Sequence, residues 1–325
     1  MIKIDLVYLW CDGNDPAFQE RKSAFRKNNN KIDGEGKERF FDNQELKYSL
    51  RSVEKYANWI HHIFIVTDRQ IPKWLNTKNE KISIIDHSII LPKELIPCFN
   101  STVIERYIYK IPGLSEYFLY GNDDTFFGKE ISPNYFFKKG VPVVRVKSFS
   151  AFNGELNRRN ILDVYKKTRF WGKSVIVSWN AIMQKKHLTH IQPYELSHNF
   201  DPYLKSEYEK TFISYKKTFD SSLNRFRDES DVNRILFSMN LVLNNKGYLT
   251  IKSNCSKFDK IKSFILQKKL EDLYVEKNIK SLLVFLFLNP VLFCINDTRS
   301  ARSIDNFFER IILNIKFRNK SSYEI

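Results

Sequence analysis

Short β-branched runs alternate with stretches of helical periodicity through the first part of the chain, and this alternation constrains the fold more than any other feature. Apolar residues recur at the spacing of one helix face over 46–56, after Asp42, which is placed to cap that helix. A second helix is expected over 101–109. Strands are expected over 3–9, 63–66, 82–85 and 117–120. The alternation predicts an α/β fold with a doubly wound, mostly parallel sheet.

Acidic residues follow two of these predicted strands. Asp12 and Asp15 lie in the turn after the first strand, and Asp123 and Asp124 come directly after Asn122 at the end of the fourth. Ligands of such sheets bind beyond the carboxyl ends of the strands, so we expect the two clusters to lie close together. Paired carboxylates can hold a hard divalent cation on nucleotide phosphates. The structural alternative is an ordinary Asn-Asp-Asp turn that bonds its own backbone.

The second half of the chain is expected to be more helical. After Gly140 we expect a strand over 141–146 and helix again after Arg299. The polar segment 28–38 is expected to be a mobile loop. No internal repeat or low-complexity linker is present, so 1–140 and 141–325 are expected to form one compact unit. Further helices are expected over 175–186, 201–219 and 228–244.

The charge balance is strongly basic. Lys and Arg outnumber Asp and Glu by 53 to 37, which gives a formal net charge of +16. Such an excess favours anionic partners: nucleotides, phosphate polymers, nucleic acid or an anionic membrane. A solvated, highly charged surface explains it equally well.

The sequence is typical of a cytoplasmic protein. The N-terminal residues lack the long apolar run and cleavage site of a signal peptide. The apolar segment 281–295 is short and interrupted by Asn289 and Pro290, so we expect a buried helix end and no membrane span. The cysteines have no paired spacing, which predicts neither a disulfide framework nor a zinc site. They stand at positions 11, 98, 255 and 294.

Two histidines and one arginine are candidates for chemistry. His198 precedes Pro202 and Lys205, and a neutral imidazole there could deprotonate a hydroxyl near pH 7. His190 is a rival, and a structural role is open for either. Arg227 could present a bidentate fork to a phosphate, although pairing with a neighbouring aspartate is the ordinary explanation.

Several enzyme classes are excluded by their missing motifs. The chain has no GxxxxGK[ST], GxGxxG, GxSxG or HExxH motif, which argues against P-loop nucleotidases, dinucleotide oxidoreductases, serine hydrolases and zincins. Helix-turn-helix and zinc-finger spacings are also missing. A basic chain rich in Tyr and Phe could still stack on single-stranded nucleic acid, so a polyanion-binding module remains an alternative.

Four blocks of sequence resemble the Stealth family in the family's order. That family contains bacterial capsular polysaccharide phosphotransferases and the animal N-acetylglucosamine-1-phosphotransferase. The second block is long and specific, with Asp42-Asn-Gln-Glu-Leu and Gly121-Asn-Asp-Asp-Thr-Phe-Phe-Gly as its clearest parts. The blocks frame nearly the whole chain, and no block of the family is assigned to the stretch between about 140 and 196. They cover 4–16, 39–128, 198–231 and 294–324.

The resemblance implies a Rossmann-like, GT-A-like fold whose half 1–140 binds a nucleotide sugar and whose half 141–325 completes the active site. His198 would be the general base and Arg227 a phosphate clamp. Asp123 or Asp124 would hold the donor or a Mg²⁺ or Mn²⁺ ion. The donor pocket would be lined by Trp10, Asp12, Asp15, Arg39, Asp42, Arg51, Asn122 and Lys205.

The resemblance also implies the reaction. A hydroxyl of an oligosaccharide or polysaccharide acceptor would attack the β-phosphorus of a UDP-N-acetylhexosamine, release UMP and form a phosphodiester. The alternative is an ordinary glycosyltransferase that releases UDP. A nucleic-acid partner is not expected. A polyanionic product made at a lipid carrier would place the enzyme beside the inner face of the plasma membrane, so we expect peripheral, salt-reversible membrane contact.

Overall fold

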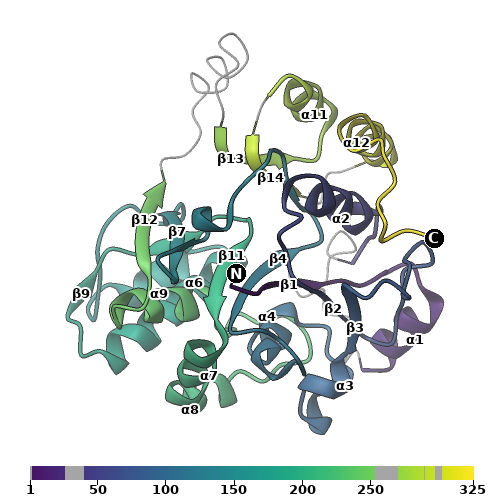
Figure 1. The fold of residues 1–325 in the computed structure, drawn as a ribbon. Coiled ribbons are helices and arrows are strands. Elements are labelled where there is room, and N and C mark those ends of the chain that lie inside the picture. Colours follow the sequence, from purple (N-terminus) through teal and green to yellow (C-terminus); the bar gives the residue numbers. More distant parts are fainter. Residues whose placement is uncertain (1, 26–39, 253–269, 289, 297–301) are drawn as a thin grey trace.

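The centre of the molecule is a five-stranded sheet in the order β11-β4-β1-β2-β3 (Figure 1). The computed structural model describes residues 2–25, 40–252, 270–288, 290–296 and 302–325. Four strands of the sheet are parallel, which confirms the predicted fold class, and each lies within two residues of its predicted range. They are β1 (Ile4–Leu9), β2 (Ile63–Thr67), β3 (Ile82–Asp86) and β4 (Tyr117–Asn122).

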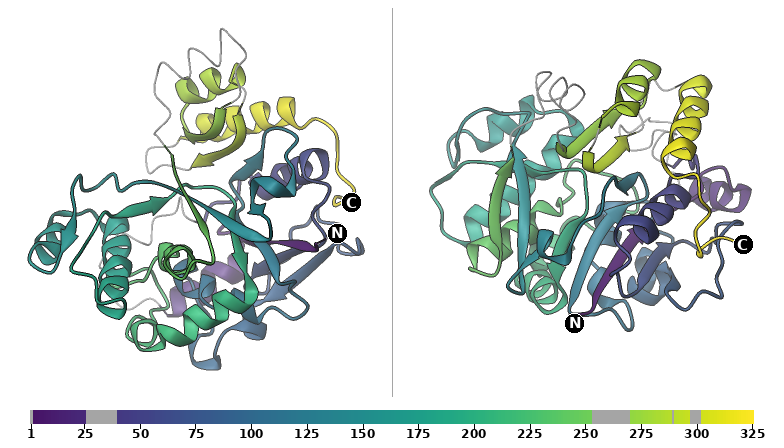
Figure 2. Two further views of the ribbon diagram at one scale, coloured as in Figure 1. Left: turned by 60° about the vertical axis from the view of Figure 1, so that its left-hand side comes forward. Right: turned by 45° about the horizontal axis from the view of Figure 1, so that its top comes forward.

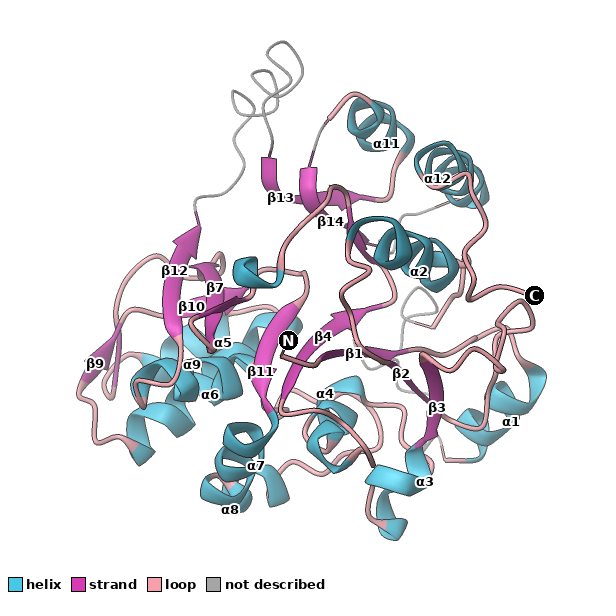
Figure 3. Cartoon of the chain, viewed as in Figure 1, coloured by secondary structure: helices cyan, strands magenta, loops and turns pink. Residues whose placement is uncertain are grey.

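Both faces of the sheet are buried under helices, as Figure 3 shows. Successive side chains of a strand point to opposite faces, and Val7 of β1 joins one core cluster while its neighbours Leu6 and Tyr8 join the other. Helix α2 (Glu45–Tyr56) covers the second face. Helices α4 (Ser101–Glu105) and α6 (Phe170–Lys185) contribute to the cluster on the first. The sheet is therefore wound on both sides.

Strand β11 (Asp201–Leu204) brings the second half of the chain into this sheet. It pairs antiparallel with β4, with Asp201 opposite Tyr120 and Leu204 opposite Tyr117. The single helix predicted over 201–219 is wrong here, because Pro202 disfavours a helical neighbour and is tolerated on an edge strand. Helix follows only as α7 (Lys205–Ser214) and α8 (Lys216–Asp220).

The helix predicted over 228–244 is also too long. Helix α9 begins only at Ile235 and ends at Leu243. Before it, the Asp228 carboxylate accepts a hydrogen bond from the Ser230 amide, and the Asp231 carboxylate accepts one from the Asp228 amide. Such side-chain bonds to nearby amides compete with a helix.

The second half also supplies strands that the helical prediction omitted. One sheet has the order β10-β7-β12, with β6 paired to β7, and another has the order β13-β14-β5. β8 and β9 form a separate pair. The strands are β5 (Thr125–Phe127), β6 (Phe137–Lys138), β7 (Val141–Ser148), β8 (Leu156–Asn157), β9 (His190–Ile191), β10 (Tyr194–Leu196), β12 (Tyr248–Lys252), β13 (Leu270–Glu276) and β14 (Pro290–Asn296).

The C-terminal elements form a layer of their own beside α2 (Figure 2). Helix α11 (Ile279–Leu286) and helix α12 (Ser303–Lys316) pack beside strands β13 and β14 over a third core cluster. The apolar segment 281–295, expected to be a helix end, instead contains the last part of α11 and most of β14. Within the described ranges no helix is both long and apolar enough to cross a bilayer.

The remaining helices connect these layers. The loop expected over 28–38 lies outside the described residues. The helix predicted over 101–109 is divided between α4 and the 3-10 turn η3. The other helical elements are α1 (Pro16–Ala24), α3 (His87–Ile90), η2 (Lys93–Leu95), η3 (Ile108–Lys110), η4 (Pro133–Tyr135) and α5 (Ile161–Lys167).

Candidate active site

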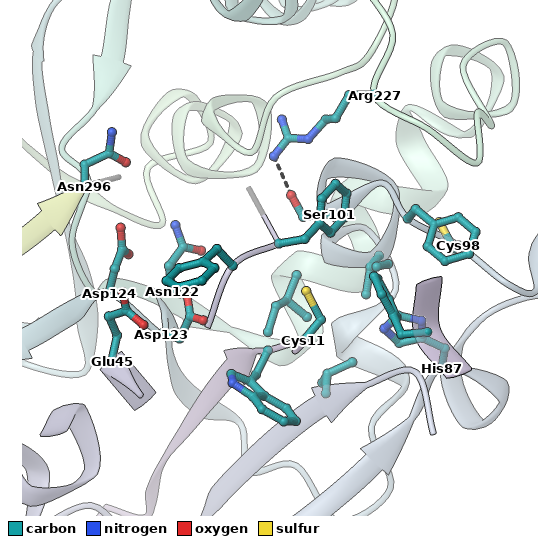
Figure 4. A pocket seen from close by; sticks show the side chains of 18 of the residues that line it. Cys11, Glu45, His87, Cys98, Ser101, Asn122, Asp123, Asp124, Arg227 and Asn296 are labelled. Atoms are coloured by element: carbon teal, nitrogen blue, oxygen red, sulfur yellow. Dashed lines mark hydrogen bonds between the residues drawn. The ribbon is translucent and has the colours of Figure 1, made fainter. Parts of the chain in front are cut away.

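A pocket of about 400 Å³ lies at the carboxyl ends of β1, β2 and β4 (Figure 4). Parallel strands bring their carboxyl ends to one edge of the sheet, and Leu9 of β1 stands opposite Asn122 of β4. Because β11 is antiparallel to β4, its first residue, Asp201, lies at this same edge of the sheet. His198, three residues before Asp201, therefore also lies at this edge and lines the pocket. Six predicted site residues line the pocket: Trp10, Asn122, Asp123, Asp124, His198 and Arg227.

One end of the pocket is acidic. Asp123, Asp124 and Glu45 lie together at this end, with Asn296 nearby in Figure 4. Burial, and then the charges of Asp124, Glu45 and Asp42, raise the pKa of Asp123 well above its usual range. Burial, followed by the charge of Glu45, likewise raises the pKa of Asp42 to about 7. At Asp124, burial is instead outweighed by the charge and hydrogen bond of His198, which lower the pKa of this carboxyl, so the carboxyls at this end differ in how readily they ionise.

His198 joins this acidic end through one ring nitrogen. Its Nε2 lies 3.0 Å from Asn122 Nδ2 and 3.3 Å from Asp124 Oδ1. A neutral Nε2 can accept from the amide, and a protonated Nε2 can donate to the carboxylate. Burial lowers the pKa of the imidazole, but the charge and hydrogen bond of Asp124 outweigh it, so the pKa lies above its ordinary value. Asp124 therefore favours the protonated form of this imidazole.

A buried polar network orients Asn122 beneath His198. The Tyr120 hydroxyl lies 3.1 Å from Asn122 Oδ1 and 3.1 Å from Glu105 Oε1. Arg234 in turn donates to Glu105 Oε2 at 3.0 Å and to Asp201 Oδ2 at 2.7 Å. The hydroxyl beside Asn122 Oδ1 fixes the amide so that its Nδ2 faces the histidine. This network therefore positions the partner of His198 Nε2.

Arg227 reaches the pocket from the segment before α9. Its Nη2 donates to Ser101 Oγ at the start of α4, as Figure 4 shows. Asp231 is bonded to Asn100 and Thr102, and Asp228 to Ser230. Among the described residues no carboxylate lies within salt-bridge distance of Arg227, so its fork is available to an anion in the pocket.

The other end of the pocket is apolar and aromatic. Phe18, Phe40 and Phe99 line it, with ring centroids of Phe18 5.8 Å from Phe40 and 5.4 Å from Phe99. His87 lies at this end, opposite Asp124 in Figure 4. Burial lowers the pKa of its imidazole to about 4, so the ring is neutral at pH 7. Its Nδ1 is buried and has no hydrogen-bond partner in the described parts of the chain.

Three predicted pocket residues lie near the pocket without lining it. Asp42 accepts a hydrogen bond at 3.3 Å from Nε1 of Trp10, which lines the pocket. Its carboxylate accepts from the Gln44 amide, yet α2 begins at Glu45, so Asp42 is not the N-cap that the sequence predicted. Asp15 is the N-cap of α1, and the Asp12 carboxylate accepts from the Asn14 amide.

Two predicted pocket residues lie elsewhere. Arg51 makes a bidentate bond to Glu324, with both distances 2.7 Å, and donates to the Phe317 carbonyl. Lys205 lies at the opposite edge of the sheet from His198, because β11 separates them, and its ammonium donates to the Leu114 carbonyl. Arg39 is outside the described residues. His190, the rival base, is exposed on β9 and does not line the pocket.

Several residues that line the pocket were not predicted as site residues. Glu45 belongs to the second block of the family resemblance and lies at the start of a predicted helix, close to Asp42. This position could have identified Glu45 as a candidate site residue. His87 follows β3 directly, and only the parallel sheet reveals that β3 ends at the same edge as β1. Asn296 and Ile295 come from β14, which was expected to be helical.

Asp124, His198 and Cys294 together offer three possible metal-ligand atoms, all within 4.8 Å of one another. The Cys294 thiol donates to Asp124 Oδ2 at 3.2 Å. Burial, and then the charge of Asp124, raise the pKa of this thiol well above its ordinary value. Asp123 and Glu45 line the same end of the pocket as Asp124, and carboxylate oxygens are ligands that suit Mg²⁺ or Mn²⁺.

Two models of conserved regions match the chain. Stealth protein CR1, conserved region 1, matches residues 3–30, and Stealth protein CR2, conserved region 2, matches residues 39–144. These ranges contain Trp10, Asn122, Asp123 and Asp124, whereas His198 and Arg227 lie beyond them.

Among solved structures, the glycosyltransferase GlyE of Streptococcus pneumoniae matches 98% of this chain and 64% of its own, with 10% identity and a TM-score of 0.43. The galactosyltransferase LgtC matches 95% of both chains, with 9% identity and a TM-score of 0.43.

Several curated proteins are similar over most of the chain. The capsular polysaccharide phosphotransferase of Haemophilus influenzae is 32% identical over 93% of this chain and 80% of its own length. A protein of the same description from Actinobacillus pleuropneumoniae is 33% identical over 95% of this chain and 80% of its own. One from Neisseria meningitidis serogroup B is 32% identical over 94% and 79%. With such relatives along nearly its whole length, and with both conserved regions present, the chain belongs to the Stealth family and is a phosphotransferase.

Proposed function

We propose that this enzyme transfers a hexose or N-acetylhexosamine 1-phosphate from a UDP-sugar to a hydroxyl of an oligosaccharide or polysaccharide. The products are UMP and a phosphodiester in a capsular or other cell-surface polysaccharide. The observation that carries the proposal is that His198 and Arg227, both from the second half of the chain, meet Asp123 and Asp124 in one pocket. Together they supply a base, an anion-binding fork and a carboxylate pair, which are the groups that phosphoryl transfer requires.

The pocket suggests how the donor lies. The Phe18, Phe40 and Phe99 rings offer an apolar surface for a pyrimidine base, and the imidazole of His87 lies at the same end of the pocket as a polar contact for it. The diphosphate then lies near Arg227, and the sugar extends toward the acidic end. A pocket of about 400 Å³ is within the range of small-ligand sites.

His198 acts as the general base in this proposal. The neutral imidazole removes the proton of the acceptor hydroxyl, whose oxygen forms a bond to the β-phosphorus. The bond between the β-phosphorus and the bridging oxygen breaks, and UMP departs with that electron pair. The imidazolium is then stabilised by Asp124, whose oxygen lies 3.3 Å from Nε2. Arg227 balances charge on the phosphoryl oxygens.

A divalent cation fits the acidic end. Asp123, Asp124 and Glu45 bring carboxylate oxygens to this end of the pocket, and such oxygens are ligands for a hard divalent cation. Asp123 and Asp124, with Glu45 beside them, would hold Mg²⁺ or Mn²⁺. When bound, the ion would neutralise charge on the donor phosphates.

We place the enzyme in the cytoplasm. The thiols of Cys11, Cys98 and Cys294 are free, which suits a reducing compartment. Cys255 lies outside the described residues.

Identifying the released nucleotide tests the reaction. The protein is incubated with a panel of UDP-sugars, short acceptors and Mg²⁺ or Mn²⁺, and products are analysed by mass spectrometry and phosphorus NMR. UMP and a new diester signal are expected. UDP without a diester would show an ordinary glycosyltransferase and overturn the proposal. His198→Ala should abolish turnover, whereas His190→Ala, at an exposed histidine outside the pocket, should not.

A further inference from the structure

Helices α11 and α12 lie side by side on one side of the molecule, away from the five-stranded sheet (Figures 1 and 2). Each helix buries apolar side chains against the third core cluster, among them Leu282 and Phe285 of α11 and Ile312 and Leu313 of α12. Each also exposes large apolar side chains. We call these the α11–α12 face: Leu283, Val284, Ile304, Phe307, Ile311 and Ile315.

The exposure of this face is large. The six side chains are between 39% and 61% exposed. Those of α12 recur at i, i+3, i+7 and i+11, which places them in one stripe along the helix. Scattered apolar residues on a protein surface are ordinary, whereas a grouped set on two neighbouring helices marks an interaction site.

The exposed charges of α11, of α12 and of the residues directly after them have one sign. In 279–288 and 302–320 the acidic residues, Asp305 and Glu309, are buried. The exposed charged side chains there are all basic: Lys280, Arg302, Arg310, Arg318 and Lys320. A surface that combines apolar side chains with a basic border is complementary to an anionic lipid surface, where acyl chains lie beneath negative headgroups.

We infer that the α11–α12 face inserts its apolar side chains into the surface of an anionic membrane, with its basic residues at the headgroups. A second copy of the chain is a poorer occupant, because two such faces would bring like charges together. This inference goes beyond the proposed reaction and does not depend on the donor. It also changes the expectation of purely salt-reversible contact, because salt screens the charges and leaves the apolar insertion in place.

Vesicle flotation without any substrate tests the inference. The vesicles consist of phosphatidylcholine alone or with phosphatidylglycerol. The unsubstituted protein should bind the anionic vesicles more tightly, and high salt should reduce this binding without abolishing it. Phe307→Ser/Ile311→Ser should lower the partition coefficient by about tenfold or more. The matched control is Leu162→Ser/Ile213→Ser, at exposed apolar residues of α5 and α7, and should bind as the unsubstituted protein does.

Charge variants test the basic border. Arg310→Gln and Arg318→Gln should each weaken binding to anionic vesicles roughly fivefold and leave binding to neutral vesicles unchanged. Circular dichroism and turnover of a soluble acceptor verify that each variant is folded, and a failed assay of the reaction does not affect the flotation result.

Three results would overturn the inference. One is absence of binding to anionic vesicles, and another is equal binding by the Phe307/Ile311 variant and its control. The third is a dimer in light scattering that becomes monomeric in the Phe307/Ile311 variant, since a second copy would then cover the face.

Discussion

Lys277→Met removes a buried ammonium that holds the C-terminal layer to the pocket wall. Lys277 Nζ lies 3.0 Å from Glu45 Oε1 on α2 and 2.9 Å from Glu309 Oε2 on α12. All three side chains are buried. Removing one partner of a buried ion pair costs about 3–5 kcal/mol, because the other charge stays buried without its partner. Such a loss is a large part of the about 5–15 kcal/mol that stabilises a typical domain.

Urea unfolding followed by circular dichroism measures this loss. The matched control is Lys216→Met: the Lys216 ammonium lies 2.6 Å from Asp220 on an exposed helix face, and its loss should cost no more than about 0.5 kcal/mol. A Lys277→Met loss no larger than that of the control would refute the reasoning. Lys277→Met/Glu309→Gln should recover part of the stability, because it removes one of the two unpaired carboxylates.

The Lys277→Met penalty should also depend on pH. Burial, and then the charge of Glu45, already raise the pKa of Glu309 well above its usual range in the folded protein. Without the ammonium the pKa rises further. A carboxyl whose folded pKa exceeds its unfolded pKa destabilises the fold at high pH, and this cost falls as pH drops through the folded value. The stability gap between Lys277→Met and the unsubstituted protein should therefore be widest at high pH and narrow as the pH falls through the raised folded pKa of Glu309.

Three further predictions concern the pocket. The pH–rate profile should have an acid limb above the ordinary imidazole pKa of about 6.5, because Asp124 outweighs burial at His198 and only the neutral ring is a base. Asp124→Asn removes the charge that raises the pKa of His198, so the acid limb of its pH–rate profile should move to lower pH. A limb that does not move would show that His198 does not cause it. Arg227→Lys loses the bidentate fork and should lower kcat on the order of 10²-fold with an unchanged fold, whereas a change in KM alone would assign Arg227 to ground-state binding. His87→Leu should raise KM for the UDP-sugar about tenfold with little change in kcat. If the variant and the unsubstituted protein have equal KM values, the pyrimidine base of the donor does not bind beside His87.

Local patterns predicted the part of the site that the first half builds. Asp123 and Asp124 follow a strand that is recognisable by its apolar run, and the rule for parallel sheets then places them at the edge where Trp10 also lies. Local sequence patterns could not predict which side chains far apart in the sequence would pair with each other. Arg51 was expected in the pocket, and only the folded chain reveals its partner, Glu324, near the C-terminus.

The direction of β11 was the other missing fact. A strand of four residues with a proline has too little periodicity to be distinguished from the start of a helix. Its antiparallel pairing decides that His198 joins the pocket and Lys205 does not. The roles of the seven residues from His198 to Leu204 could therefore be assigned only once the pairing of β11 in the sheet was known.

The same pairing has a consequence for how this family can diversify. The chain leaves the sheet after β4 and returns to it in β11, directly beside β4, so the two ends of the intervening excursion are held about 4.8 Å apart by backbone hydrogen bonds. The excursion can change in length or content while its two anchor points stay fixed. Asp123, Asp124 and His198 stand near the two ends of this segment, so changes in its middle need not move the aspartates and the histidine relative to each other.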